Sequence, residues 1–409
     1  MAEHEVEQAL RRLADGRAPG RGVLLHKINC GTEDLIDFLA RHYLETYIPE
    51  GGSKIKFVTG RPGSGKTQLL ELLADAAESR GFLIVELSAA EVWMHDFREL
   101  YLAILKRLDL QAILRSCAYE IIREMGYNPR EIPAGQTFLD FLAERREADA
   151  ISKSTIRSLL RNYFTKNPVL DNCFAGCCSL LTGDMLGYPA LDNASRELLY
   201  SCLYGEKGVK ASQLRALGIT PARVTKQNAR HLLRSLAEII HRSGLSGLLV
   251  EIDDLERLML SSTDLPIRYT KGKRDDAYEN IRQLIDDIDS MRYLFFILGF
   301  DRDLIDNENS GMKSYQALWL RIQNEIVSTH FNCFADILDL DRLDDQVFNA
   351  DLLCELSEKV SAVFLENGVA AAPLSEEQAC EVLDAARYGS LGLPYLMIRR
   401  VLAGGVENV

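Results

Sequence analysis

The fold of this chain is decided by residues 57–67, which read Phe57-Val58-Thr59-Gly60-Arg61-Pro62-Gly63-Ser64-Gly65-Lys66-Thr67. An apolar run of strand character leads into a glycine-rich turn, and the helical run Gln68-Leu69-Leu70-Glu71-Leu72-Leu73 follows. The spacing of glycine, glycine, lysine and threonine is that of a phosphate-binding loop between a strand and a helix. A glycine turn that matches by chance lacks both flanking elements, so the stretch predicts an α/β protein that binds nucleotide.

Each position of this loop has a physical task. Glycines at 60, 63 and 65 are expected to adopt positive φ and to turn backbone N–H groups toward phosphate oxygens. The helix that begins here adds unpaired N–H groups and the positive end of its dipole. Lys66 is expected to reach the β and γ phosphates and Thr67 to ligate Mg²⁺, which predicts ATP and magnesium as cofactors. The predicted nucleotide-binding residues are Gly60, Arg61, Pro62, Gly63, Ser64, Gly65, Lys66, Thr67 and Gln68.

Composition is that of an ordinary globular protein. The 409 residues are 47% hydrophobic and 26% charged, and the net charge of −13 argues against indiscriminate nucleic-acid binding by the whole surface. The N-terminal stretch is acidic without an apolar core, and nowhere do 18 apolar residues run together, so we expect a cytoplasmic protein that contacts no membrane.

Nine cysteines are scattered along the chain. One cluster, Cys173-Phe-Ala-Gly-Cys177-Cys178, lacks the paired C-x-x-C spacing of a zinc site, and no second cluster or histidine pair accompanies it. Buried free thiols in a reducing compartment are therefore expected.

Strand character recurs around the loop. Residues 82–87 predict a buried parallel strand, and further strands are predicted at 247–254, 293–299 and, more weakly, 337–340. Residues 97–243 instead predict successive helices, which implies a large all-helical insertion between the second and third core strands of a three-layer, parallel-sheet α/β core. The strand at 293–299 is expected between the phosphate-loop strand and the strand at 247–254.

Three domains are predicted along the chain. An arm, residues 1–48, comprises a helix at 5–14, an extended piece at 22–28 and a helix at 34–48, and is expected to pack against the nucleotide. The core spans 49–335, with 97–243 as the insertion. Residues 336–409 predict a small helical lid that holds 5 basic and 14 acidic residues, a net charge of −9.

The strand at 247–254 supplies the second half of the nucleotide site. Asp253 is the predicted Mg²⁺ ligand at the strand tip, and Asp254 falls where a carboxylate orients the attacking water. The aspartate at 254 is one methylene shorter than a glutamate in this role would be. Glu256 is a substitute carboxylate for orienting the water, at a less usual spacing. The competing interpretation is a surface strand that ends in a solvated acidic turn.

Two further side chains are assigned catalytic roles. At the end of the 293–299 strand, Asp301 is a candidate sensor of the γ phosphate. In the amphipathic run 314–322, Arg321 is predicted to project toward a neighbouring subunit and to offset transition-state charge there. A solvated or salt-bridged arginine is the alternative, and the role in trans implies a homo-oligomer.

Together these features resemble AAA+ ATPases of the branch close to the origin-recognition initiators, and more narrowly the ATP-binding proteins of BREX phage-defence systems. The resemblance implies an AAA+ P-loop core, ATP dependence and a place in an anti-phage operon, beside a helicase, nuclease or DNA methyltransferase. It runs over most of the chain, through 18–23, 30–33, 50–53, 57–67, 80–84, the helix of Tyr101, 203–206, 214–219, 228–229, 247–250 and 314–318.

The sequence departs from this family pattern at three places. Asp254 replaces the usual glutamate, which implies slow hydrolysis. Thr32 stands where an arginine often follows the glycine. Tyr395 occupies the position of a lid arginine, with Arg399 as a substitute.

A basic segment predicts DNA contact. Residues 201–246 hold eight basic residues against two acidic ones, and local basic density is what phosphate backbones require. Residues 211–221 also resemble the first helix and turn of a helix-turn-helix. The alternative is a basic face paired with acidic residues, such as those of the lid.

The leading hypothesis from sequence is an ATP-hydrolysing component of a defence system that couples Mg·ATP to assembly with DNA or an effector. One rival is a nucleotide-gated scaffold that hydrolyses little and recruits a helicase or nuclease. A second rival is a DNA-binding regulator of the origin-recognition type.

Overall fold

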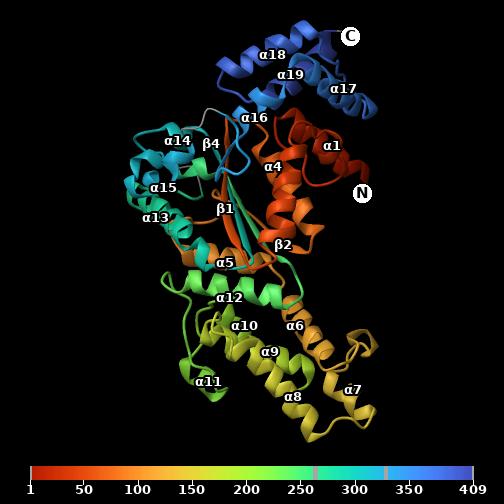
Figure 1. The fold of residues 1–409 in the computed structure, drawn as a ribbon, viewed down its shortest axis with the longest axis vertical. Helices are drawn as coiled ribbons and strands as arrows, with labels where there is room; N and C mark the ends of the chain where they lie inside the picture. Colours follow the sequence, from red (N-terminus) through yellow and green to blue (C-terminus); the bar gives the residue numbers. More distant parts are fainter. Residues whose placement is uncertain (1, 261–265, 327–329, 408–409) are drawn as a thin grey trace.

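A five-stranded parallel sheet forms the centre of the computed structural model, which describes residues 2–260, 266–326 and 330–407 (Figure 1). Its strands lie in the order β2-β3-β4-β1-β5, and every pair is parallel. The expected position of β4 between β1 and β3 is confirmed. The strands are β1 (Ser53–Gly60), β2 (Phe82–Ser88), β3 (Gly247–Asp253), β4 (Leu294–Asp301) and β5 (Ile337–Asp339).

Both faces of the sheet are covered, which explains why its strands are almost continuously apolar. Alternate side chains of a strand point to opposite faces, so neighbouring residues join different cores. Val58, Leu249 and Phe295 pack with α3 (Glu33–Leu39), the π-helical segment Ala40–Tyr47 and α4 (Lys66–Glu78). Phe57 and Phe296 belong to the other core, with α5 (Phe97–Arg107), α12 (Ala229–Arg242) and α13 (Lys271–Asp287).

The prediction of an extended piece at 22–28 is wrong. Residues Val23–Lys27 form the short helix α2, which lies against α4. Only Leu25 of this helix is buried, and Val23 is 86% exposed. The β-branched and leucine-rich run suggests a strand, but strand propensity is decided by packing between strands, and α2 pairs with none.

Between β2 and β3 the chain is helical, as the periodicity predicts. Residues 89–246, all of them described, form no strand. Helices α6 to α11 extend away from the sheet into the lower part of Figure 1, while α5 and α12 contact β2 and β3. The bounds are α6 (Leu110–Glu124), α7 (Phe138–Glu144), α8 (Ala150–Leu160), α9 (Asn172–Leu186), α10 (Asn193–Leu203) and α11 (Ala211–Ala216).

Helix α9 is the core of this helical region. It contacts α6, α7, α8, α10 and α12. Because neighbours surround it, buried residues occur around its whole circumference, among them Phe174, Cys178 and Leu181. A helix buried on all sides lacks the one-sided apolar stripe by which helices are usually recognised in sequence.

A third core joins the two ends of the described chain. Leu10 and Leu13 of α1 (Ala2–Ala14) pack with buried residues of α17 and α19, including Val360 and Val401. The C-terminal helices and α1 accordingly lie together above the sheet in Figure 1. The remaining helices are α14 (Asp303–Asp306), α15 (Gln316–Ile326), α16 (Leu340–Val347), α17 (Ala350–Glu366), α18 (Glu376–Tyr388) and α19 (Leu393–Glu407).

Candidate nucleotide site

The loop between β1 and α4 has the backbone of a phosphate nest. Gly63 and Gly65 lie at φ +81° and +86°, in the left-handed region. Gly60 does not, so the expectation of positive φ is wrong there. Its reason for being glycine is steric, because a Cβ at this position would lie 2.3 Å from the Ser64 hydroxyl oxygen. The first turn of α4 directs its unpaired N–H groups toward the same loop.

Thr67 and Asp253 meet across the site. The Thr67 hydroxyl donates to Oδ2 of Asp253 at 2.7 Å, and Oδ1 accepts from the backbone N–H of Asp254 at 2.9 Å. Asp253 ends β3, and a Cβ on Gly299 of the adjacent β4 would come within 2.5 Å of its carboxylate. Burial raises the pKa of Asp253. A hydroxyl and a carboxylate in hydrogen-bond contact are hard oxygen donors of the type that Mg²⁺ requires, so the pair fits this ion.

Lys66 is engaged by the protein itself. Its Nζ lies 2.7 Å from Oδ1 of Asp301 and donates to the carbonyl of Arg61 at 2.9 Å. Asp301 ends β4, the strand beside β1, which brings the two side chains together. Asp301 therefore lies where the sequence places a γ-phosphate sensor, and there it neutralises the lysine.

The other acids at this end of the sheet are also held in place. Asp254 has φ +62°, and its carboxylate accepts from the Ser88 hydroxyl at the end of β2, at 2.5 Å. Glu256 accepts from the backbone N–H of Asp301 at 3.1 Å. Burial raises the pKa of Glu256 to about 7, and the carboxylate of Asp301 adds to this. The acids after β3 and β4 thus converge on one edge of the sheet rather than forming a solvated turn.

The C-terminal helices rest directly on the phosphate loop. The backbone N–H of Gly392 donates to the carbonyl oxygen of Pro62 at 2.9 Å, and the N–H of Tyr395 donates to the carbonyl oxygen of Gly63 at 3.2 Å. The Tyr395 side chain lies so close to Gly63 that a Cβ there would approach it to 2.4 Å. The guanidinium of Arg399 lies 5.7 Å from the centre of the Tyr395 ring.

A cavity of about 400 Å³ opens between these elements. Its walls come from the phosphate loop, including Gln68, from the ends of β3 and α19, and from α1 and the residues after it. This volume falls within the range of small-molecule sites. Residues of the stretch 12–18 therefore line the same cavity as the phosphate loop.

Three cations in the cavity wall were not identified from sequence: Arg12, Arg17 and Arg257. Arg257 lies one short turn beyond Asp254, a spacing that a search for charges near the strand tip would find. Arg12 and Arg17 line the cavity only because α1 packs on the C-terminal helices. No local sequence pattern predicts that packing. Such positive charge suits the negatively charged phosphates of a nucleotide.

Arg61 faces away from this cavity. Its backbone N–H donates to the carboxylate of Asp341 at 3.0 and 3.2 Å, and its guanidinium donates to the carbonyl of Ala386. It therefore joins the loop to α16 and α18, although the sequence places it among the nucleotide-binding residues.

Arg321 lies in α15, whose buried residues belong to the core on the opposite face of the sheet from α4. Its Nε is 2.7 Å from Asp286 of α13, and the side chain is 45% exposed. Within one chain Arg321 is thus salt-bridged and remote from Lys66. This matches the alternative prediction, a salt-bridged arginine of the helix surface.

The basic segment is divided between surface and core. Lys207, Lys210, Arg215, Arg223 and Lys226 are exposed, whereas Arg230, Arg234 and Arg242 are half-buried. Three of the eight form salt bridges: Lys226 with Asp96, Arg230 with Asp287 and Arg242 with Glu238.

The helix-turn-helix interpretation of residues 211–221 is wrong. Residues 217–228, all described, form no helix after α11, and the next helix, α12, packs against β3.

The nine cysteines are free thiols, and their expected burial is only partly right. Cys117, Cys173, Cys177 and Cys178 are buried, but Cys380 is exposed. No helix in the described ranges has the length and apolar character needed to cross a bilayer.

Comparison with known proteins gives one result. A family model described as "BREX system ATP-binding protein BrxC/D" matches residues 1–403, nearly the whole chain. No curated protein and no solved structure gives a significant match.

Proposed function

Because the chain belongs to the BREX system ATP-binding protein family BrxC/D, we propose that it is a Mg·ATP-dependent AAA+ ATPase of phage defence. The single observation that carries this proposal is the 2.7 Å hydrogen bond between Thr67 and Asp253, which joins the phosphate loop to the acid-tipped strand. A glycine-rich turn that does not bind nucleotide would not need a carboxylate partner such as Asp253.

The residues divide the work by their positions. The N–H groups of residues 63–67 and the Lys66 ammonium would bind phosphate oxygens. Thr67 and Asp253 would hold Mg²⁺, which when bound supplies positive charge to the phosphates. Asp254, fixed by Ser88, would orient the attacking water, and Arg12, Arg17 and Arg257 would add charge around the nucleotide.

The strand order supports the AAA+ assignment, since one strand separates the phosphate-loop strand from the acid-bearing strand. We propose residues 1–48 as the arm, 49–335 as the core with the helical insertion 97–243, and 336–409 as the lid. The contacts of Gly392 and Tyr395 with the loop support a lid that responds to nucleotide.

A nucleotide-gated scaffold with little hydrolysis is the second proposal. Two observations favour it: Lys66 is already paired with Asp301, and Asp254 is a short acid whose carboxylate is held by Ser88. In either case ATP would control self-association and engagement of DNA, a helicase, a nuclease or a methyltransferase. An origin-recognition-like regulator receives less support, because the helix-turn-helix interpretation failed.

The decisive experiment compares the wild type with Lys66→Ala. Loss of a charge-assisted contact to phosphate should weaken ATP binding about 10- to 100-fold and reduce phosphate release to background. Lys106→Ala, an exposed lysine of α5, is the matched control and should behave as the wild type. ATP binding without phosphate release above Lys66→Ala selects the scaffold, and absence of ATP binding by the wild type refutes both proposals.

A further inference from the structure

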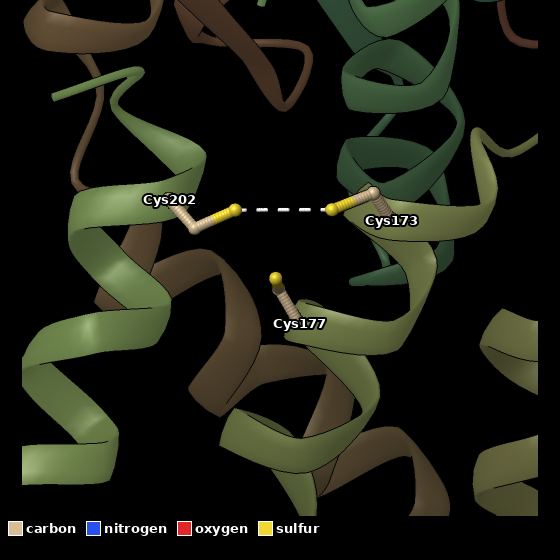
Figure 2. Close-up of side chains that lie close together, drawn as sticks. All are labelled: Cys173, Cys177 and Cys202. Carbon is tan, nitrogen blue, oxygen red and sulfur yellow. Dashed lines mark hydrogen bonds between the residues drawn. The ribbon is translucent and has the colours of Figure 1, made fainter. Parts of the chain in front are cut away.

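Three cysteine sulfurs converge inside the helical region, remote in sequence from the phosphate loop. Cys173 and Cys177 lie one turn apart on α9, and Cys202 comes from the last turn of α10. Figure 2 shows the three side chains pointing toward one another. Their Sγ atoms all lie within 4.8 Å of one another, and those of Cys173 and Cys202 are 3.8 Å apart.

These separations match a metal coordination shell. Zinc binds thiolates at about 2.3 Å, and the edge of a regular tetrahedron with that radius is about 3.8 Å. Thiolate is also the ligand type that selects zinc among common divalent ions. We propose that Cys173, Cys177 and Cys202 form a zinc site that fastens α9 to α10.

The surroundings fit an ion with one further ligand. A small cavity of about 20 Å³, room for one water or ion, is lined by the three cysteines together with Asp171, Arg223 and Asn228. One position of a tetrahedral ion remains for a water, because the Asp171 carboxylate caps α9 by accepting from the N–H groups of Cys173 and Phe174. Zinc with three thiolates carries one negative charge, and Arg223 supplies an opposite one.

Burial of cysteines alone does not explain the cluster. Cys178 follows Cys177 directly and is fully buried, as is Cys117 on α6, yet neither joins the group. The i, i+4 spacing of Cys173 and Cys177 places both thiols on one face of α9, and that face meets α10. The three thiols give no paired C-x-x-C spacing in the sequence, because the third lies on another helix.

The site has a defined mechanical consequence. Cys202 lies two residues before the segment 204–228, which carries the exposed basic residues and lines a cavity of about 570 Å³. Zinc would therefore fix the start of the basic segment, next to Cys202, to α9.

The test is the zinc content of the full-length protein, purified without a metal-affinity tag and measured by mass spectrometry of the elements. About one zinc per chain is expected in the wild type. Cys173→Ala and Cys202→Ala should lose it, whereas Cys178→Ala, a buried cysteine of the same helix, should keep it. Less than about a tenth of an equivalent in the wild type, or equal zinc in all variants, would overturn the proposal.

A second measurement uses only the wild type and so does not depend on how the variants fold. Replacing zinc by Co²⁺ should produce a thiolate-to-metal charge-transfer absorption, and a chelator should increase amide exchange in residues 204–228. An absent band, or a Cys173–Cys202 disulfide in protein kept under reducing conditions, would contradict the proposed site. Neither readout involves ATP, so the result is independent of the proposed ATPase activity.

Discussion

At the scale of single residues, the contact between Lys66 and Asp301 has the clearest consequence. The lysine ammonium needed for phosphate is neutralised by a carboxylate at 2.7 Å, so ATP must replace a partner that is already present. The same carboxylate lies where a negatively charged phosphate of ATP is expected to bind. Both effects oppose binding, and both originate in one side chain.

We therefore expect Asp301→Asn to bind ATP about fivefold more tightly, because a partly exposed ion pair contributes up to about 1 kcal/mol. Titration of a fluorescent ATP analogue measures this. Asp303→Asn, an exposed acid two residues later, is the control and should not change the affinity. Weaker binding in Asp301→Asn would instead make this carboxylate part of the nucleotide site.

Glu71, on α4 behind the phosphate loop, links stability to pH. Burial raises its pKa from 4.5 to about 7, although Arg12 and the N–H of Gly20 favour the charged form. Glu86 and Asp75, which also face it, raise the pKa further. The folded protein then holds more protons than the unfolded chain between about pH 4.5 and pH 7, so stability falls as the pH rises through this window.

Glu71→Gln removes this ionisation and should therefore stabilise the protein at pH 8, by about 1–2 kcal/mol, and have little effect near pH 4.5. Urea denaturation at the two pH values measures the difference. Glu78→Gln, an exposed acid of the same helix, is expected to show no such pH dependence. An equal effect of Glu71→Gln at both values would show that the carboxyl stays ionised throughout.

Much of the residue-level site is predictable because it is local. Lys66 and Thr67 follow from the glycine spacing, and Asp253 follows from an apolar run that ends in acid. Their contact then follows because β1 and β3 are parallel strands of one sheet, separated only by β4, so that both end at the same edge. Arg12 and Arg17 are not predictable in this way, because their place in the site depends on packing between segments far apart in sequence.

At the scale of elements, the docking of α19 on the phosphate loop depends on a residue without a side chain. A Cβ at Gly392 would lie 2.3 Å from the backbone N of Ser64 and 2.6 Å from the carbonyl carbon of Gly63. Backbone atoms cannot move aside to make room for a Cβ as a flexible side chain can. The contact between lid and loop therefore requires glycine at this position.

Gly392→Ala should separate α19 from the loop and weaken ATP binding several-fold, since overpacking of this kind costs about 1–3 kcal/mol. The C-terminal core begins next to this position, at Leu393, but extends over α1, α17 and α18 as well and should remain folded. Limited proteolysis with and without ATP reports the separation. Gly272→Ala, where a Cβ meets nothing within 4 Å, is the control, and identical protection in both variants would refute the docking role.

The element that the sequence assigned wrongly is α2. Its composition is typical of a strand, but it forms a short helix against α4, because tertiary contacts outweigh local preference there. The strands were predictable because each is a short apolar run, and β1, β3 and β4 are buried almost throughout.

At the scale of the whole molecule, Arg321 tests whether the ATPase is assembled from several chains. If it acts in trans, Arg321→Ala should reduce phosphate release at least about tenfold with unchanged ATP affinity. Asp286→Asn is the matched control, because it removes the same salt bridge but retains the arginine. Mass measurements should show ATP-dependent self-association of the wild type, and a monomer under ATP would exclude the role in trans.

Overall organisation was predictable to a similar degree. The alternation of strands and helices, its interruption by a long helical stretch and the helical C-terminal region can all be read from periodicity. The packing of α1 into the C-terminal core cannot be, because it joins residues nearly the whole chain apart.

This shared core has a consequence for motion. Helix α1 packs with α17 and α19, whereas α2 lies against α4 beside the phosphate loop and also reaches the C-terminal helices through Leu24 and Lys27. Any swing of the C-terminal helices would carry α1 with them, while Arg21 stays paired with Asp75 and Glu78 of α4. The ion pair between Lys27 and Glu366 of α17 would then have to break before the nucleotide entrance could open far.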